Sequence, residues 1–134
     1  MKRKENWQGL LKDYIRTQAR REYKVGKFDG PMFTAACVKV VTGKDLARGF
    51  RGYTTLLGGM KKLKAKGYDG FPELLADQLI EVPPLTARAG DVVVVDTELG
   101  LCVGIAQGHF VLCVDPVAGV GAVPMSKAVR AFTV

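Results

Sequence analysis

Apolar residues in the first half of the chain recur at the spacing of amphipathic helices. The first stripe starts after Asn6, a residue type that caps helices, and predicts a helix with an apolar face at i, i+3, i+4, i+7 and i+8. That face consists of Trp7, Leu10, Leu11, Tyr14 and Ile15. A second helix is predicted after Asp29, with Pro31 in its first turn and Gly43 as its left-handed stop. Its composition is so apolar that we expect it to be the most buried helix.

Two further helices are predicted before the pattern changes. The third spans about residues 54–66 and the fourth about residues 71–79. A Gly58-Gly59 pair inside the third costs about 1 kcal/mol per glycine relative to alanine, which indicates close packing against another element. The residues of the third helix that we expect to face inward are Leu56, Leu57, Met60 and Leu63.

Beyond Ile80 the period becomes that of strands. Short strands are predicted at 92–95, 101–106, 110–114 and 129–134, whereas Val82-Pro83-Pro84 cannot lie in a central strand because proline lacks the N–H donor. We therefore predict an α+β fold, with N-terminal helices packed on a small antiparallel sheet, in one domain of residues 1–134. No apolar run approaches the ~20 residues of a membrane span.

Charge is divided unevenly along this domain. Residues 1–66 carry 17 Lys and Arg against 5 Asp and Glu, and residues 67–134 carry 3 against 8. The region 1–79 is thus mainly helical and basic, and the region 80–134 is mainly β and mildly acidic. The favoured interpretation of this asymmetry is that surface helices are simply rich in Lys and Arg, because no nucleic-acid-binding motif accompanies the charge. The basic surface also suits an acidic partner, with nucleic acid as the less favoured alternative. The candidate partner-binding cations are Arg16, Arg20, Lys61, Lys62, Lys64 and Lys66.

The chain offers few groups for catalysis. Its three cysteines, an odd number without a Cys-x-x-Cys pair, indicate neither a disulfide framework nor a zinc site, and we expect no metal and no cofactor. Any mechanism that needs an imidazole must use His109, the single histidine. One alternative function is therefore a cysteine hydrolase that pairs Cys102 or Cys37 with His109.

Several short motifs follow one another in order. Residues 23–29 read Tyr-Lys-Val-Gly-Lys-Phe-Asp, residues 41–45 read Val-Thr-Gly-Lys-Asp, and residues 51–53 read Arg-Gly-Tyr. Later come Arg-Ala-Gly-Asp-Val-Val at 88–93 and Val-Gly-Ile at 103–105. In this order they resemble a family of small phage and prophage tail proteins of unknown function, related to the NlpC-type papain-fold cell-wall peptidases. The resemblance implies a papain-like fold over most of residues 6–134.

The same resemblance implies that the chemistry has been lost. In the NlpC-type peptidases a Cys opens the helix and a His precedes the Val-Gly-Ile strand, and these two positions are Gly30 and Cys102 here, with Asp29 and His109 as neighbours. Members of the tail family usually carry Trp where this chain has Val25 and Cys where it has Gly30. The implied role is a catalytically inactive structural protein of the tail tip or baseplate, in contact with the distal hub and central fibre. It would be assembled in the bacterial cytoplasm and reside in the virion; on the alternative, the hydrolase would act on cell-wall peptides.

Overall fold

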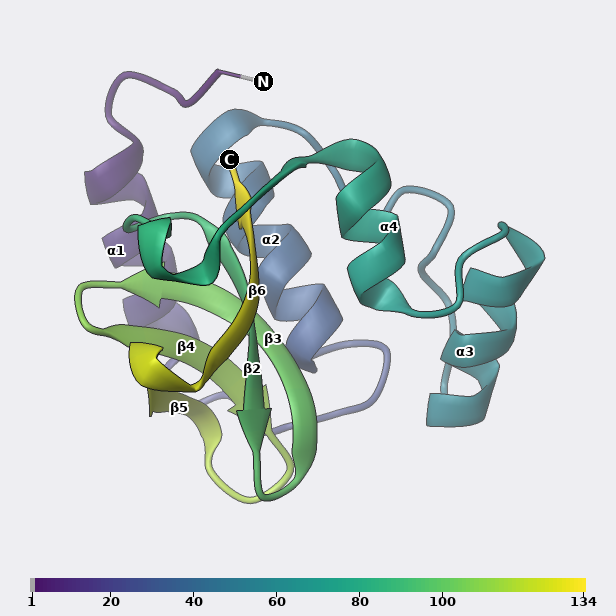
Figure 1. Ribbon diagram of the computed structural model, residues 1–134. Coiled ribbons are helices and arrows are strands. Elements are labelled where there is room, and N and C mark those ends of the chain that lie inside the picture. The colour runs from purple at the N-terminus through teal and green to yellow at the C-terminus, as the bar shows by residue number, and fades with distance from the viewer. Residues whose placement is uncertain (1) are drawn as a thin grey trace.

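The computed structural model describes residues 2–134, in which helices pack on an antiparallel sheet (Figure 1). The helices are α1 (Trp7–Gln18), α2 (Gly30–Thr42), α3 (Leu56–Ala65) and α4 (Phe71–Gln78). The strands are β1 (Ile80–Val82), β2 (Val92–Thr97), β3 (Gly100–Gln107), β4 (Phe110–Asp115), β5 (Gly119–Pro124) and β6 (Ala128–Thr133). Single 3-10 turns occupy Pro84–Thr86 and Met125–Lys127. The predicted α+β class is confirmed.

The sheet has the strand order β1-β6-β2-β3-β4-β5, and every neighbouring pair is antiparallel. Strands β2, β3 and β4 correspond to the three consecutive strands that were predicted, β5 extends this meander, and β6 returns to lie beside β2. The sequence did not predict β1 or β5. β1 is a three-residue edge strand before Pro83, and β5 contains Gly119 and Gly121 and ends at Pro124, so neither shows a clear alternation of apolar and polar residues.

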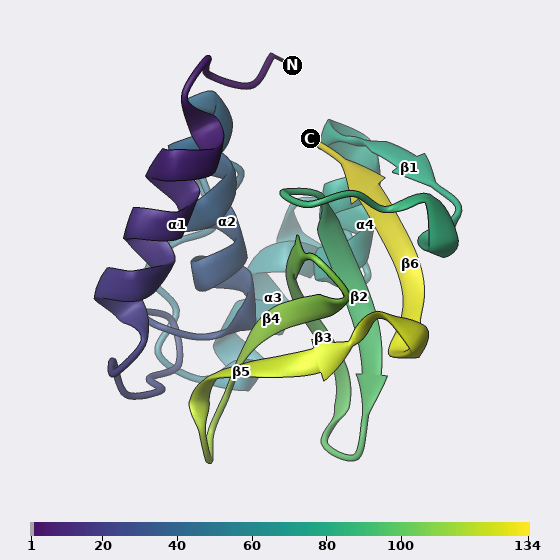
Figure 2. The same cartoon turned by 90° about the vertical axis from the view of Figure 1, so that its left-hand side faces the viewer.

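Both faces of the sheet are buried. Val92 and Val94 belong to the main core on the side of α2, whereas Val93 and Val95 belong to a second cluster on the opposite face, which includes Met125 at its margin. Successive strand residues point to opposite faces, which explains why four valines in a row are all buried. Figure 2 shows α1 and α2 together on one side of the sheet, with β6 curving around the other.

The central position predicted for α2 is confirmed. Seven of its residues are buried, its N-cap Asp29 accepts a hydrogen bond from the backbone of Met32, and Gly43 ends it at φ 84°. Only glycine adopts this left-handed conformation without strain. The cap predicted for α1 is wrong, because the side chain of Asn6 makes no capping hydrogen bond.

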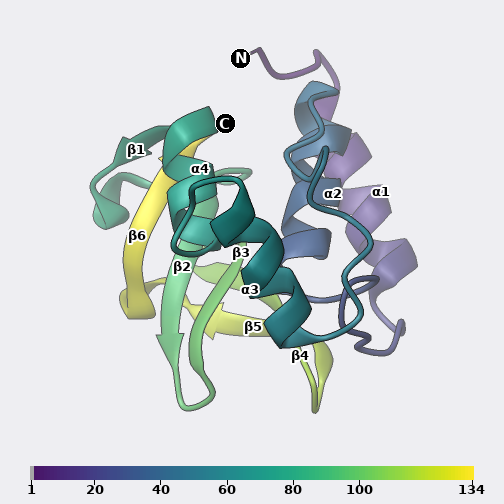
Figure 3. The ribbon, with the colours of Figure 1, turned by 90° about the vertical axis from the view of Figure 1, so that its right-hand side faces the viewer.

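The inward face predicted for α3 is also wrong for three of its four residues. Leu63 is buried, but the three large side chains nearer the N-terminus point to solvent. A Cβ on Gly59 would lie 3.1 Å from Cδ2 of Tyr53, so the ring closes against the glycine face of the helix. This packing leaves the opposite face of the helix exposed. Figure 3 shows α3 on the side of the molecule that faces the viewer, in front of the sheet. The exposed residues are Leu56, Leu57 and Met60.

Candidate functional site

The start of α2 is built around a buried carboxylate. Asp29 is only 4% exposed. Its Oδ1 accepts a hydrogen bond from the backbone N–H of Met32 at 2.9 Å, and its Oδ2 accepts from the N–H of Gly26 at 2.8 Å and from the hydroxyl of Tyr53 at 2.5 Å. The carboxylate thus fixes the loop before the helix, the first turn of the helix and the segment leading to α3. Its capping role was predicted, whereas its contact with Tyr53, 24 residues away, has no local signal in the sequence.

Tyr53 is held in its neutral form by this arrangement. Burial raises the pKa of the phenol, and the hydrogen bond to Asp29 and the negative charge of that carboxylate raise it further. A phenol that stays protonated donates to Asp29 throughout the physiological pH range. The hydrogen bond from Tyr53 to Asp29 therefore works as a structural tie.

Gly30, the position where the resemblance places a nucleophilic Cys, faces β3. A Cβ built on Gly30 would lie 3.4 Å from the carbonyl oxygen of Val103 and 3.5 Å from its Cγ1, which are ordinary van der Waals distances. The helix N-terminus therefore does abut the strand on which a catalytic base was expected. Its opposing side chain is the apolar Val103, so this contact carries neither a nucleophile nor a base.

Cys102, the other expected position, does not converge with Gly30. It packs in the cluster on the far face of the sheet, opposite Val95 in the register of β2 and β3, and its Sγ lies 3.7 Å from Oγ1 of Thr97. Neighbouring strand residues point to opposite faces, so a one-residue difference places Val103 toward α2 and Cys102 away from it. The expectation that Gly30 and Cys102 mark the two halves of one vestigial site is corrected accordingly.

The pairs proposed for a thiol hydrolase are also not assembled. His109 is exposed in the turn after β3, while Cys102 lies near the other end of that strand. At about 3.3 Å per residue, the five steps from Cys102 to Gln107 at the end of β3 already span ~16 Å. Cys37 is fully buried in the middle of α2, where burial raises the pKa of its thiol. Cys113 is buried as well, and its pKa is raised to about 12, chiefly by burial.

Two surface hollows can be compared with the expected site, and one of them lies beside α2. One, of about 240 Å³, has an aromatic floor that includes Phe28 and Phe33 and a basic rim that includes Arg21, Lys27 and Arg51. The other, of about 340 Å³, lies between the end of α1 and the turn before β5. Neither hollow is lined by the residues expected to carry chemistry, which are Gly30, Cys102 and His109.

The predicted partner-binding cations form two separate groups. Arg16 and Arg20 are exposed on and just after α1, where Arg16 pairs with Asp13. The four lysines Lys61, Lys62, Lys64 and Lys66 are exposed on α3 and at its C-terminal cap. Figure 1 shows α1 and α3 at opposite sides of the molecule, so one small ligand cannot contact both groups.

A second buried carboxylate ties the two ends of the chain together. Asp91 is 3% exposed, and its Oδ1 accepts from Arg3 at 2.8 Å and from the N–H of Val134 at 3.1 Å. Arg3 also donates to the carbonyl oxygens of Ala89 and Val134, each at 2.8 Å, and its guanidinium lies 4.3 Å from the ring centroid of Trp7. Sequence reasoning missed this clasp because its hydrogen-bonded partners are 43 to 131 residues apart.

Metal and membrane sites receive no support from the described residues. Within residues 2–134, no three or more His, Cys, Asp or Glu side chains are grouped so that they could hold a metal ion. In that same part of the chain, no helix has the length and apolar character needed to cross a membrane.

Comparison with known proteins gives one family. The family described as "Domain of unknown function (DUF6950)" matches residues 2–134, which is nearly the whole chain. No curated protein matches the chain.

Proposed function

We propose that this chain, which belongs to the DUF6950 family, is a structural component of a phage tail. It packs in the tail tip or baseplate between the distal hub and the central fibre, on a papain-like scaffold of the NlpC type that performs no hydrolysis. It joins the tail in the bacterial cytoplasm and stays in the virion. Its partners are other tail proteins, and it needs no cofactor.

The observation that carries this proposal is the contact between the start of α2 and β3. The sequence resemblance places a nucleophilic Cys at the first residue of α2, and a helix N-terminus is where a thiolate is stabilised. Gly30 occupies that position and has no atom that can attack a substrate, while Val103 opposite it has none that can accept a proton. The carboxylate of Asp29, beside Gly30, accepts its hydrogen bonds from Gly26, Met32 and Tyr53 and so stabilises the fold.

A packing role is further supported by the surfaces that the fold leaves free. The α3 lysines and the exposed apolar residues beside them form a basic edge that the rest of the described chain leaves uncovered. Exposed apolar residues rimmed by charges are typical of protein–protein interfaces. A rigid domain that presents such an edge can bind an acidic neighbour in an assembly without any chemistry.

The test is co-purification from cells that are producing the phage or prophage particles encoding this chain. A tagged chain should recover hub and fibre proteins in fixed ratios, as measured by quantitative mass spectrometry. The matched control is the same chain with Lys61→Glu and Lys64→Glu, which keeps the fold and reverses the charge of the α3 edge. Recovery of no tail protein by the unaltered chain would contradict the proposal.

The absence of hydrolysis needs its own assay. The purified chain, incubated with cell-wall peptides, should release no fragment beyond a heat-denatured sample. Cleavage that disappears in Cys102→Ala or Cys37→Ala would instead support the thiol hydrolase. Cleavage that survives in both variants would point to a contaminating hydrolase, and the assay is then repeated after a further purification of the chain.

A further inference from the structure

One surface of the molecule is apolar and basic at once. On α3 the side chains of Leu56, Leu57 and Met60 are 68%, 65% and 43% exposed, and Lys61 and Lys64 are exposed beside them. The helix packs by its other face, through Gly59 and Leu63. We call the five exposed residues the α3 patch. Three large apolar side chains of this patch are exposed to water, which does not stabilise the fold, and an apolar patch rimmed by charges is typical of an interaction site.

A second surface has the opposite charge. The β2–β3 hairpin ends in a turn at residues 98–99, where Leu99 and Leu101 are each 65% exposed and Asp96 and Glu98 are exposed beside them. The register pairs Asp96 with Leu101, so acidic and apolar side chains stand next to each other. We call these four residues the hairpin tip.

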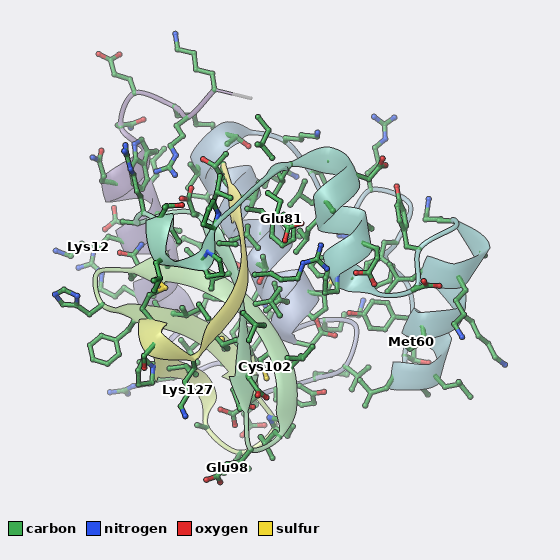
Figure 4. All side chains as sticks on the ribbon, in the orientation of Figure 1. Lys12, Met60, Glu81, Glu98, Cys102 and Lys127 are labelled. Atoms are coloured by element: carbon green, nitrogen blue, oxygen red, sulfur yellow. The ribbon has the colours of Figure 1, made fainter. Side chains whose placement is uncertain are left out.

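The two surfaces lie on different parts of the molecule. Figure 4 labels Met60 on α3, at one side, and Glu98 at the lower end of the hairpin. A single copy can therefore use both surfaces at the same time, each with a different neighbour. The exposed apolar residues of the two surfaces resemble each other in size, and their charges are complementary.

We propose that the α3 patch of one copy binds the hairpin tip of a second copy. Contact between two α3 patches would bring lysines together, and contact between two hairpin tips would bring carboxylates together, so only the α3–tip contact combines apolar burial with opposite charges. Such a head-to-tail contact closes into a ring, or into a reciprocal dimer, if the rotation between copies allows it. This inference rests on the two surfaces alone and does not depend on the proposed phage role.

The contact is small, so the expected association is weak and depends on protein concentration. Its electrostatic part is screened by salt, because the charges lie at the surface and the Debye length falls to about 3 Å at 1 M ionic strength. Association should therefore be stronger at low salt. Copies held side by side in a larger assembly would bind more strongly, because their local concentration is high.

Sedimentation equilibrium of the purified chain, from micromolar to millimolar concentration, tests the proposal. The unaltered chain should increase in mean mass with concentration. Lys61→Glu with Lys64→Glu should weaken self-association by about tenfold or more, and so should Asp96→Lys with Glu98→Lys, since each makes like charges face each other. Mixing the two variants should restore association, because the acidic surfaces of the first then meet the basic surfaces of the second.

Two control variants change the same amount of charge elsewhere. Lys2→Glu with Lys12→Glu, before and on α1, and Glu5→Lys with Glu22→Lys, should leave self-association unchanged, since all four residues are exposed and lie outside both surfaces. A chain that stays monomeric at every concentration would overturn the proposal, and so would self-association that survives both pairs of reversals. If the monomer instead binds vesicles that contain phosphatidylglycerol and loses this in Leu56→Ser with Met60→Ser, α3 is a membrane-surface helix and the proposal is likewise overturned.

Discussion

Replacing Asp29 by alanine should cost clearly more stability than removing a carboxylate that accepts backbone hydrogen bonds at an exposed turn. Three donors lose their acceptor at once: the N–H groups of Gly26 and Met32 and the hydroxyl of Tyr53. Loss of an N-cap costs about 0.5–2 kcal/mol, and a buried donor left without a partner costs about 1–3 kcal/mol. Because the loop can relax around Gly26, we expect a total of about 2–5 kcal/mol. This is a large share of the roughly 5–15 kcal/mol that stabilises a typical domain.

Urea unfolding, followed by circular dichroism and by the fluorescence of Trp7, measures this cost. The matched control is Asp115→Ala, because Asp115 also accepts two backbone hydrogen bonds, both at 2.8 Å, but does so at an exposed turn. The control should lose less than about 1 kcal/mol. A double-mutant cycle with Tyr53→Phe isolates the pair between the carboxylate and the phenol, whose coupling should be about 1–3 kcal/mol. The reasoning is refuted if Asp29→Ala costs no more than the control, or if the coupling is near zero.

Three further predictions concern the α2 start, the buried thiols and the terminal clasp. Gly30→Cys should fold with unchanged stability, since the new Cβ meets Val103 at ordinary contact distance. In the native protein the new thiol, at a helix N-terminus, should be alkylated faster than the buried thiols of Cys37 and Cys113. Equal alkylation rates would contradict this placement. The free energy of unfolding should fall as pH rises above about 8.5. The reason is that the buried thiols of Cys37 and Cys113 have raised pKa values in the folded protein and ionise more readily once it unfolds. Urea midpoints that stay constant from pH 8 to 11 would contradict this. Arg3→Ala should cost about 2–4 kcal/mol, because a buried carboxylate loses its cation, and an unchanged urea midpoint would disprove the clasp.

The parts of the fold that local rules control were predictable. The cap at Asp29, the left-handed stop at Gly43 and the change from helical to strand period each depend on neighbouring residues, and the structure has all three. The weak strands were not predictable in this way. β5 has glycines at two of its six positions and ends in proline, and it is a strand because its backbone pairs with β4.

The outward face of α3 shows why helical periodicity alone can mislead. Periodicity marks an apolar stripe but does not say whether another element covers it. Here the ring of Tyr53, in the segment just before α3, packs on Gly59, and this contact orients the helix with its glycine face inward. The Gly58-Gly59 pair did indicate close packing, and it marked the buried face that the leucine pattern obscured.

Of the two positions expected to face each other in the candidate site, the sequence predicted only the one on α2 correctly. On β3 the predicted residue was wrong by one position. Gly30 starts α2 as expected, since its cap and its proline are local signals. The opposing residue depends on which face of β3 points to α2, and in a sheet with two buried faces the apolar pattern does not distinguish Cys102 from Val103. Only the three-dimensional register resolves it.

The central claim, that the chain is a structural part of a phage tail, is tested most directly by the protein content of purified particles. Phage particles are purified from cells that carry the gene for this chain, their tails are separated, and the chain is quantified by mass spectrometry against the hub protein. The account predicts that the chain is present in a fixed ratio to the hub and remains after a salt wash. Its absence from tails that contain the hub in normal amount would contradict the account.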